Sequence, residues 1–221
     1  MDNVEVDFDG SQLKVMGIQD ATKLVALRGS IAQKLSELSL HKEDLMFSYR
    51  CLDELINEQL SSTTRRSLWL SAITFYTKCF DKTVKRKSLP EEEIFRHESP
   101  TAILVHNHFK TLRNKHLIHD ENPLSQSTPA AALNDGTKSY KIEKIICLNT
   151  FGETYSKESH TNLSLLIQLA IKNVTFNFNK LCDELTIELE KESYQSLSSR
   201  NEPTYTVPTT AEFTQKKNNH L

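Results

Sequence analysis

The chain has 221 residues, of which 38% are apolar, and its 27 basic and 29 acidic residues give a formal net charge of −2. This balance excludes a protein that coats nucleic acid over its whole surface, although it leaves room for a local basic site. No apolar run approaches the roughly 18 residues that a membrane-spanning helix needs. The acidic start MDNVEVDFDG is not a secretory signal. We therefore expect a soluble, cytoplasmic protein with no membrane partner.

Glycine and cysteine usage narrow the fold class. Only five glycines occur, no glycine-rich phosphate loop is present, and leucine-rich stretches are long, which favours helices. The cysteines lie far apart and form no C-x-x-C pair, so buried free thiols are expected rather than disulfides or a zinc site. They are Cys51, Cys79, Cys147 and Cys182.

Residues 1–18 are predicted to form a small β-hairpin. Apolar side chains alternate over 4–8 and again over 13–15, on either side of a favoured Asp9-Gly10 turn. An isolated hairpin is only marginally stable in water, so we expect a further strand to pair with it.

Three amphipathic stretches follow the hairpin. Apolar residues at 3-and-4 spacing predict a helix that begins at Ala21 and continues to residue 38. The polar stretch Ser39–Asp44 is expected to interrupt it before a second helix over 45–56. The residues Ser61–Thr64 offer caps for a third helix over 62–80. Its apolar positions are the densest in the chain, so we place it at the centre of a helical bundle.

A charged connection over 81–99 joins the third helix to the fourth. Three glutamates follow a basic cluster in it, and such runs are usually solvated loops. A phosphate-contacting patch is the alternative interpretation. The basic cluster consists of Lys82, Lys85, Arg86 and Lys87.

The fourth helix is predicted to begin at Pro100, because proline favours a first helical turn, and to end near His119, before Pro123. Residues 120–140 are rich in Pro, Ser, Asn and Gly and are expected to form a loop. A strand is predicted over 140–149, and we expect it to pair with the N-terminal hairpin.

The last predicted helix covers 159–192 and is followed by a polar tail, 193–221, that we expect to be disordered or laid loosely on the surface. The fold class is therefore mainly α. It is an antiparallel helical bundle over 19–192, interrupted by a loop and strand insertion over 120–158 and preceded by the small hairpin.

The fourth helix ends in a concentration of arginine, asparagine and histidine. Histidine exchanges protons near neutral pH, and arginine grips phosphate with two donors, so the set suits phosphodiester chemistry without a metal. On a wheel of about 100° per residue, Arg113 lies at the edge of one stripe and Asn114 points away from it. The stripe consists of Val105, Phe109, Leu112, His116 and His119.

Two other interpretations of these residues stay open. Basic residues in a last helical turn interact well with the negative end of the helix dipole, and they often do nothing else. His116 and His119, three residues apart, could also share a metal. However, His106 and His108 project to other sides of the helix, and no H-E-x-x-H motif is present. We therefore expect no metal and no other cofactor.

The segment NHFKTLRNKHLIHDEN (Asn107–Asn122) resembles the signature of the HEPN superfamily (higher eukaryote and prokaryote nucleotide-binding). That signature is an arginine, often followed by a polar residue, and then a histidine after a short spacer. Here Arg113 is followed by Asn114, and His119 comes after five intervening residues. The segment looks most like the abortive-infection-related branch, as does the preceding helix SLWLSAITFYTKCFDK. The resemblance covers roughly residues 65–122.

The resemblance implies a helical bundle that dimerises through its motif helices and cleaves RNA without a metal. It implies that His119 is the acid or base, that Arg113 binds phosphate and that Asn114 orients the pair or the substrate. His116 is an auxiliary residue or an interface residue. Two lysines of the same segment, Lys110 and Lys115, are further phosphate-binding candidates.

The implied partners are RNA, a second copy of the chain and a nucleotidyltransferase-like antitoxin, because many members of the superfamily are toxins or phage-defence effectors. The alternative is a non-catalytic helical module that binds a partner protein or a nucleotide through the same surface. The near-neutral charge favours this alternative, because few basic residues are present to grip RNA nonspecifically.

Overall fold

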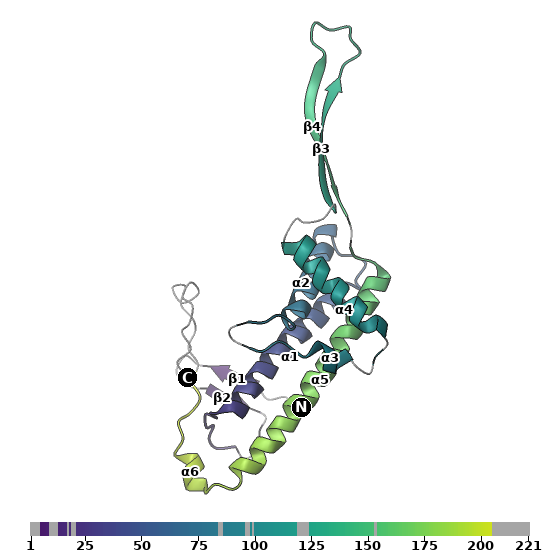
Figure 1. Cartoon of the computed structure of the whole chain (residues 1–221). Helices are drawn as coiled ribbons and strands as arrows, with labels where there is room; N and C mark the ends of the chain where they lie inside the picture. Colours follow the sequence, from purple (N-terminus) through teal and green to yellow (C-terminus); the bar gives the residue numbers. More distant parts are fainter. Residues whose placement is uncertain are drawn as a thin grey trace. The chain divides into compact units, whose positions relative to one another are not determined.

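The computed structural model describes residues 5–8, 13–16, 18, 21–83, 86–95, 98, 100–118, 124–152 and 154–204. The chain divides into two compact units. The larger unit is Leu35–Lys180, and the smaller one combines Met1–Lys34 with Leu181–Leu221. The structure is mainly helical, as the sequence predicts (Figure 1).

The helices form where apolar residues recur at helical spacing. Ser61 caps α2, since its Oγ accepts a hydrogen bond from the Thr64 amide at 3.1 Å. The expected break at Ser39–Asp44 is wrong, because α1 is continuous through this polar stretch. The helices are α1 (Ser30–Glu54), α2 (Ser62–Lys78), α3 (Glu91–Phe95), α4 (Pro100–Leu112), π-helix η1 (Arg113–Ile118), α5 (Lys157–Leu189) and α6 (Tyr194–Ser198).

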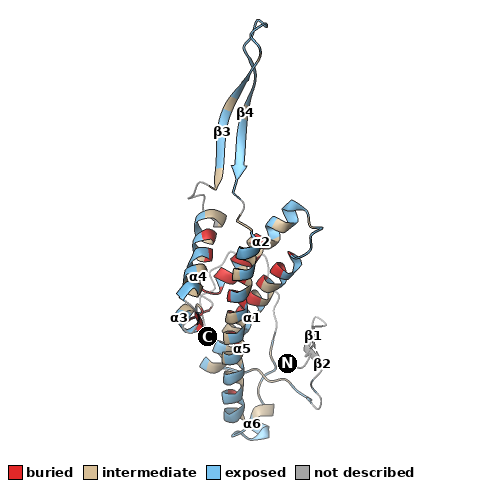
Figure 2. Cartoon of the chain, turned by 90° about the vertical axis from the view of Figure 1, so that its right-hand side faces the viewer, coloured by how far each residue is buried: buried red, intermediate tan, exposed pale blue. Residues whose placement is uncertain are grey.

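The core of the larger unit lies between α1, α2, α4 and α5, whose buried residues are red in Figure 2. Trp69 of α2 packs edge-on against Phe109 of α4 and against Tyr155, which precedes α5. Its Nε1 donates a hydrogen bond to Thr154 Oγ1 at 2.9 Å. Burying such large aromatic side chains is the main stabilising contribution in a bundle of this size. The largest fully buried apolar side chains are Trp69, Tyr76, Phe109, Leu45, Leu52, Leu55, Ile73, Leu163, Ile167 and Val174.

The strands form two separate hairpins. β1 (Glu5–Phe8) pairs antiparallel with β2 (Leu13–Met16), as the alternation predicts. β4 (Ile142–Phe151) is also a strand as predicted, but the expected partner is wrong. It pairs with β3 (Ser125–Leu133), within the stretch that we expected to be a loop. At the base of this hairpin a Cβ on Gly152 would lie 2.5 Å from Leu124 Cδ2, so a larger residue there would require the Leu124 side chain to move.

The smaller unit differs from expectation at both of its ends. Residues 21–28 are not helical, and α1 begins at Ser30, directly after Gly29, whose φ of 98° is left-handed. The Ala26 amide instead donates to the Asn201 carbonyl at 2.8 Å. In the tail that we expected to be disordered or laid loosely on the surface, Ser193 caps the short helix α6, which has no buried residue, while 205–221 lie outside the described residues.

Candidate functional site

The Arg113–Ile118 segment continues α4 as a π-helix rather than as an α-helix. A π-helix closes i→i+5 hydrogen bonds, so it winds more loosely than the α-helix assumed on the helical wheel. The predicted stripe therefore holds as far as Leu112: Phe109 and Leu112 are buried and Val105 is half-buried. It does not extend at the same angles to His116. π-Helical turns occur often at functional sites, and this one coincides with the residues that the sequence singles out.

Arg113 is held against the C-terminal end of α2. Its Nε donates to Thr77 Oγ1 at 3.3 Å, and its Nη2 forms an ion pair with Asp81. The Arg113 side chain is 15% exposed, and this burial lowers the pKa of its guanidinium from the ordinary value. Because that ordinary value is so high, the group stays charged at neutral pH. Nη1 has no hydrogen-bond partner among the described residues.

The other predicted residues differ in accessibility. Asn114 and Lys115 are exposed, so both can contact a ligand from solution. His116 is half-buried, and its Nδ1 is shielded from water without a hydrogen-bond partner among the described residues. His119 lies outside the described residues, so its distance from Arg113 stays a prediction.

Lys110 is oriented differently from a phosphate-binding group. It forms an ion pair with Glu91 at the start of α3. Burial alone would raise the pKa of Glu91, but the hydrogen bond from Lys110 and the nearby His106 outweigh it and lower the pKa. The ammonium of Lys110 is therefore already balanced by a carboxylate, which weakens Lys110 as a phosphate ligand.

Sequence reasoning missed the buried group behind this pair. His106 is fully buried, and its Nδ1 lies 2.7 Å from the Tyr76 hydroxyl. Its Nε2 faces Glu91 Oε2 at 3.5 Å without forming a hydrogen bond. Phe80 and Phe95 pack on its ring at centroid distances of 4.5 and 5.0 Å. The histidine is thus part of the core, and we assign it to structure.

The pKa values in this network agree with that assignment. Burial lowers the pKa of His106, and the charge of Glu91 only partly opposes it. Burial also raises the pKa of the Tyr76 hydroxyl, with a further contribution from Glu91. Both groups are therefore neutral at physiological pH. No sequence signal marks them, because a histidine among apolar residues looks the same whether it is buried or exposed.

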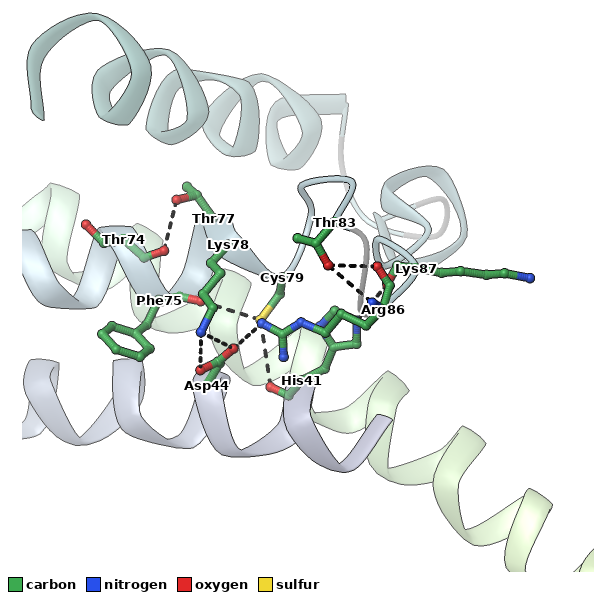
Figure 3. Close-up of polar contacts among 10 residues, drawn as sticks. All are labelled: His41, Asp44, Thr74, Phe75, Thr77, Lys78, Cys79, Thr83, Arg86 and Lys87. Atoms are coloured by element: carbon green, nitrogen blue, oxygen red, sulfur yellow. Dashed lines mark hydrogen bonds and ion pairs between the residues drawn. The ribbon is translucent and has the colours of Figure 1, made fainter. Parts of the chain in front are cut away.

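Two residues of the basic cluster after α2, Arg86 and Lys87, belong to a second polar network, drawn in Figure 3. Arg86 is only 7% exposed and forms an ion pair with Asp44 of α1, which Lys78 also contacts at 3.1 Å. His41 Nε2 lies 2.8 Å from the Lys87 carbonyl, and burial lowers the pKa of its ring. For Arg86, which is buried and paired, the solvated-loop and phosphate-patch interpretations are wrong, whereas Lys82 and Lys87 are exposed and Lys85 lies outside the described residues. Arg86 anchors the segment after α2 to α1.

Cys79 lies in the same network and is not a reactive thiol. It is fully buried, and burial raises its pKa to about 12. A thiol with so high a pKa is almost entirely protonated at neutral pH, so it is a poor nucleophile.

No protein-family model, curated protein or solved structure matches this chain. Of the predicted residues that the structure describes, Arg113, Asn114, Lys115 and His116 are consecutive in one π-helical segment, whereas Lys110 is engaged elsewhere. Among the helices of the described ranges, none is long and apolar enough to cross a membrane.

Proposed function

We propose that the chain is a metal-independent endoribonuclease of the HEPN type, built on an antiparallel helical bundle. The observation that carries the proposal is the position of Arg113, which begins a π-helical segment and is fixed against α2 by Thr77 and Asp81. A guanidinium fixed in this way keeps its charge and its direction, and we assign Nη1, which has no partner within the described ranges, to a phosphate oxygen. Asn114 lies next to it and is exposed.

The chemistry is transesterification within RNA. The ribose 2′-oxygen attacks the adjacent phosphorus, the bond to the 5′-oxygen breaks, and a 2′,3′-cyclic phosphate and a 5′-hydroxyl result. His119 takes the proton from the 2′-hydroxyl or gives one to the leaving oxygen. Arg113 stabilises the charge that develops on the phosphate oxygens. Asn114 orients the substrate, Lys115 adds a phosphate contact, and His116 is an auxiliary group.

The proposal includes a second copy of the chain, since the HEPN resemblance implies a cleft that two motif helices build together. It also includes a cytoplasmic role as a toxin or phage-defence effector, with a nucleotidyltransferase-like protein as the antitoxin. Asp81 has a defined part in this scheme. It binds Nη2 of Arg113, so it positions the guanidinium without occupying the whole of it.

The test is RNA cleavage by the purified full chain in the presence of EDTA, followed on a fluorescent single-stranded RNA. We expect cleavage by the wild type with cyclic-phosphate ends, and a fall of about 100-fold or more in Arg113→Ala and His119→Ala. Lys172→Ala removes an exposed cation from α5 and is the matched control, with wild-type activity expected. Circular dichroism would confirm that all variants are folded. Absence of cleavage by the wild type, or equal cleavage by the motif variants, would refute the proposal.

The alternative function is a non-catalytic interaction module, and one observation favours it. Both Arg113 and Lys110 are paired with carboxylates of this chain, which reduces the positive potential that RNA would meet. Under this alternative the motif variants would slow cell growth no less than the wild type on induced expression. The chain would also capture a protein partner at high and low salt alike.

A further inference from the structure

The β3–β4 hairpin exposes apolar side chains on both of its faces. No residue of either strand is buried, and Figure 2 draws the hairpin pale blue along most of its length. Two-stranded hairpins are marginally stable in water, and contiguous exposed apolar surface usually marks a contact with another molecule. The large exposed apolar residues here are Leu133 (69%), Ile142 (52%), Ile145 (63%), Leu148 (56%) and Phe151 (62%).

The hydrogen bonds at the two ends of the hairpin show which backbone groups face outward. The Gly152 amide donates to the Leu124 carbonyl at 2.6 Å, and the Asn134 amide donates to the Lys141 carbonyl at 3.1 Å. Because backbone groups alternate along a strand, the even-numbered residues of 124–132 and 144–152 face the other strand of the hairpin. The odd-numbered residues of both strands direct their N–H and C=O groups away from it.

The two outer edges differ in whether they can accept another strand. Pro129 is an odd-numbered residue of β3, so the outer edge of β3 lacks an amide at its middle. The outer edge of β4 is formed by Ile145, Cys147, Asn149 and Phe151, all of which have an amide. An uninterrupted row of unpaired N–H and C=O groups is a template for a further strand. The open edge is therefore that of β4.

We propose that β4 pairs antiparallel with β4 of a second copy about a two-fold axis at Cys147, which makes a four-stranded sheet in the order β3-β4-β4-β3. A two-fold contact uses the same edge twice, so the one uninterrupted edge of each β3–β4 hairpin is satisfied completely. At this register Ile146 of each copy lies opposite Leu148 of the other. The two apolar pairs are adjacent and extend one face of the sheet across the axis.

Charge also fits this register. Lys144 lies opposite Thr150 of the second copy at each end of the pairing, so no like charges are opposed. The bulged residue Glu143, at the shift between Leu133↔Ile142 and Ala132↔Lys144, ends the regular ladder on the side of the hairpin tip. The contact is small, below about 1,200 Å² in total, which is typical of weak complexes. We therefore expect dissociation constants in the range of about 1–100 µM.

This contact is separate from the motif helix and does not rest on the proposed function. With the axis at Cys147, the base of each hairpin lies beside the tip of the other, so the two helical bundles are at opposite ends of the sheet. The Arg113→Ala variant should lose RNA cleavage but keep the sheet contact. Loss of the sheet contact, in turn, leaves Arg113 and its partners Thr77 and Asp81 in place.

Sedimentation velocity of the full chain over a concentration series tests the proposal. Cys147→Pro removes an outward amide from the open edge, whereas Ala131→Pro removes one from the β3 edge that Pro129 already interrupts. Neither amide bonds within the hairpin, so circular dichroism should be the same for both. We expect Ala131→Pro to associate with the same dissociation constant as the wild type. In Cys147→Pro the dissociation constant should rise by at least about 50-fold. A monomeric wild type, or the same mass distribution for both variants at every concentration, would overturn the proposal.

Disulfide cross-linking tests the register. A hydrogen-bonded antiparallel pair at Cys147 has a Cα separation of about 5.5 Å, which suits a disulfide. In a Cys182→Ser background, Cys147 is the only cysteine that is not buried. Mild oxidation should therefore give a covalent dimer, and the additional Cys147→Ser change should abolish it. Association that persists without a covalent product would show that the axis is not at Cys147.

Discussion

The helical bundle and the β3–β4 hairpin belong to the same chain but differ in how far their apolar side chains are buried. In the bundle, side chains from four helices cover each other, and even polar groups such as His41, Arg86 and His106 are buried with partners. In the hairpin, leucine, isoleucine and phenylalanine side chains remain open to solvent. The bundle therefore has a buried core within one chain, whereas no residue of β3 or β4 is buried. The same substitution should therefore have very different effects in the two regions.

Matched phenylalanine truncations should give the largest difference. Phe109 is 1% exposed in the bundle, so Phe109→Ala leaves a cavity beside Trp69 and should lower the free energy of unfolding by about 3–5 kcal/mol. Phe151 is 62% exposed and contacts Arg66 through its ring, so Phe151→Ala should lower it by about 1 kcal/mol or less. Urea unfolding in dilute solution measures both. Equal losses would mean that the hairpin is part of the core.

Removing one partner of an ion pair should also change stability differently in the two regions, but by less than the phenylalanine truncations do. Asp44→Asn leaves Arg86 buried without its carboxylate and should lower the free energy of unfolding by about 3 kcal/mol. In the hairpin, Glu143 pairs with Lys138 in solvent, so Glu143→Gln should leave the melting temperature unchanged. Thermal denaturation of the two variants beside the wild type is the measurement. A stable Asp44→Asn protein would show that the Arg86 anchor is dispensable.

Lowering the pH toward about 6 should produce the smallest change in the free energy of unfolding, through two buried histidines of the bundle. The pKa values of His41 and His106 are lowered in the folded chain, so the unfolded chain takes up protons first as the pH falls below about 6.5. Stability should therefore fall between pH 7.5 and the lowered pKa values, by at most about 1.4 kcal/mol per pH unit for each histidine. Urea midpoints over this range measure the slope.

His106→Gln and the exposed His108→Gln provide the comparison for the pH series. The slope should be shallower in His106→Gln, because a buried titrating group is lost. His108→Gln removes an exposed histidine from the same helix and is the control. The same slope in both variants would show that His106 does not contribute to the pH dependence of stability.

The helices could be predicted because their apolar spacing is local, but their limits depended on distant residues. The polar stretch 39–44 suggested a break, yet His41 and Asp44 are polar because they meet Lys87 and Arg86 from another segment. β3 was missed for the opposite reason. Neither of its faces is buried, so its small residues and Pro129 show none of the alternation that marks a half-buried strand.

The candidate site was predictable only in part. The order Arg113-Asn114-Lys115-His116 is visible in the sequence, but the acids that neutralise Arg113 and Lys110 come from other elements. Asp81 follows α2 and Glu91 begins α3, so no spacing within the motif indicates them. The π-helical backbone could not be predicted either. A helical wheel drawn at about 100° per residue assumes α-helical geometry from the start, so it cannot reveal a departure from that geometry.

Pro129 also decides how far self-association can proceed. If both outer edges were open, each added copy would present a fresh template and growth would continue as a fibre, without a defined end. A proline in the middle of one edge stops such growth after a single addition. The hairpin can therefore remain apolar and exposed in a crowded cell, because one residue that cannot donate a hydrogen bond limits association through the hairpin to one added copy.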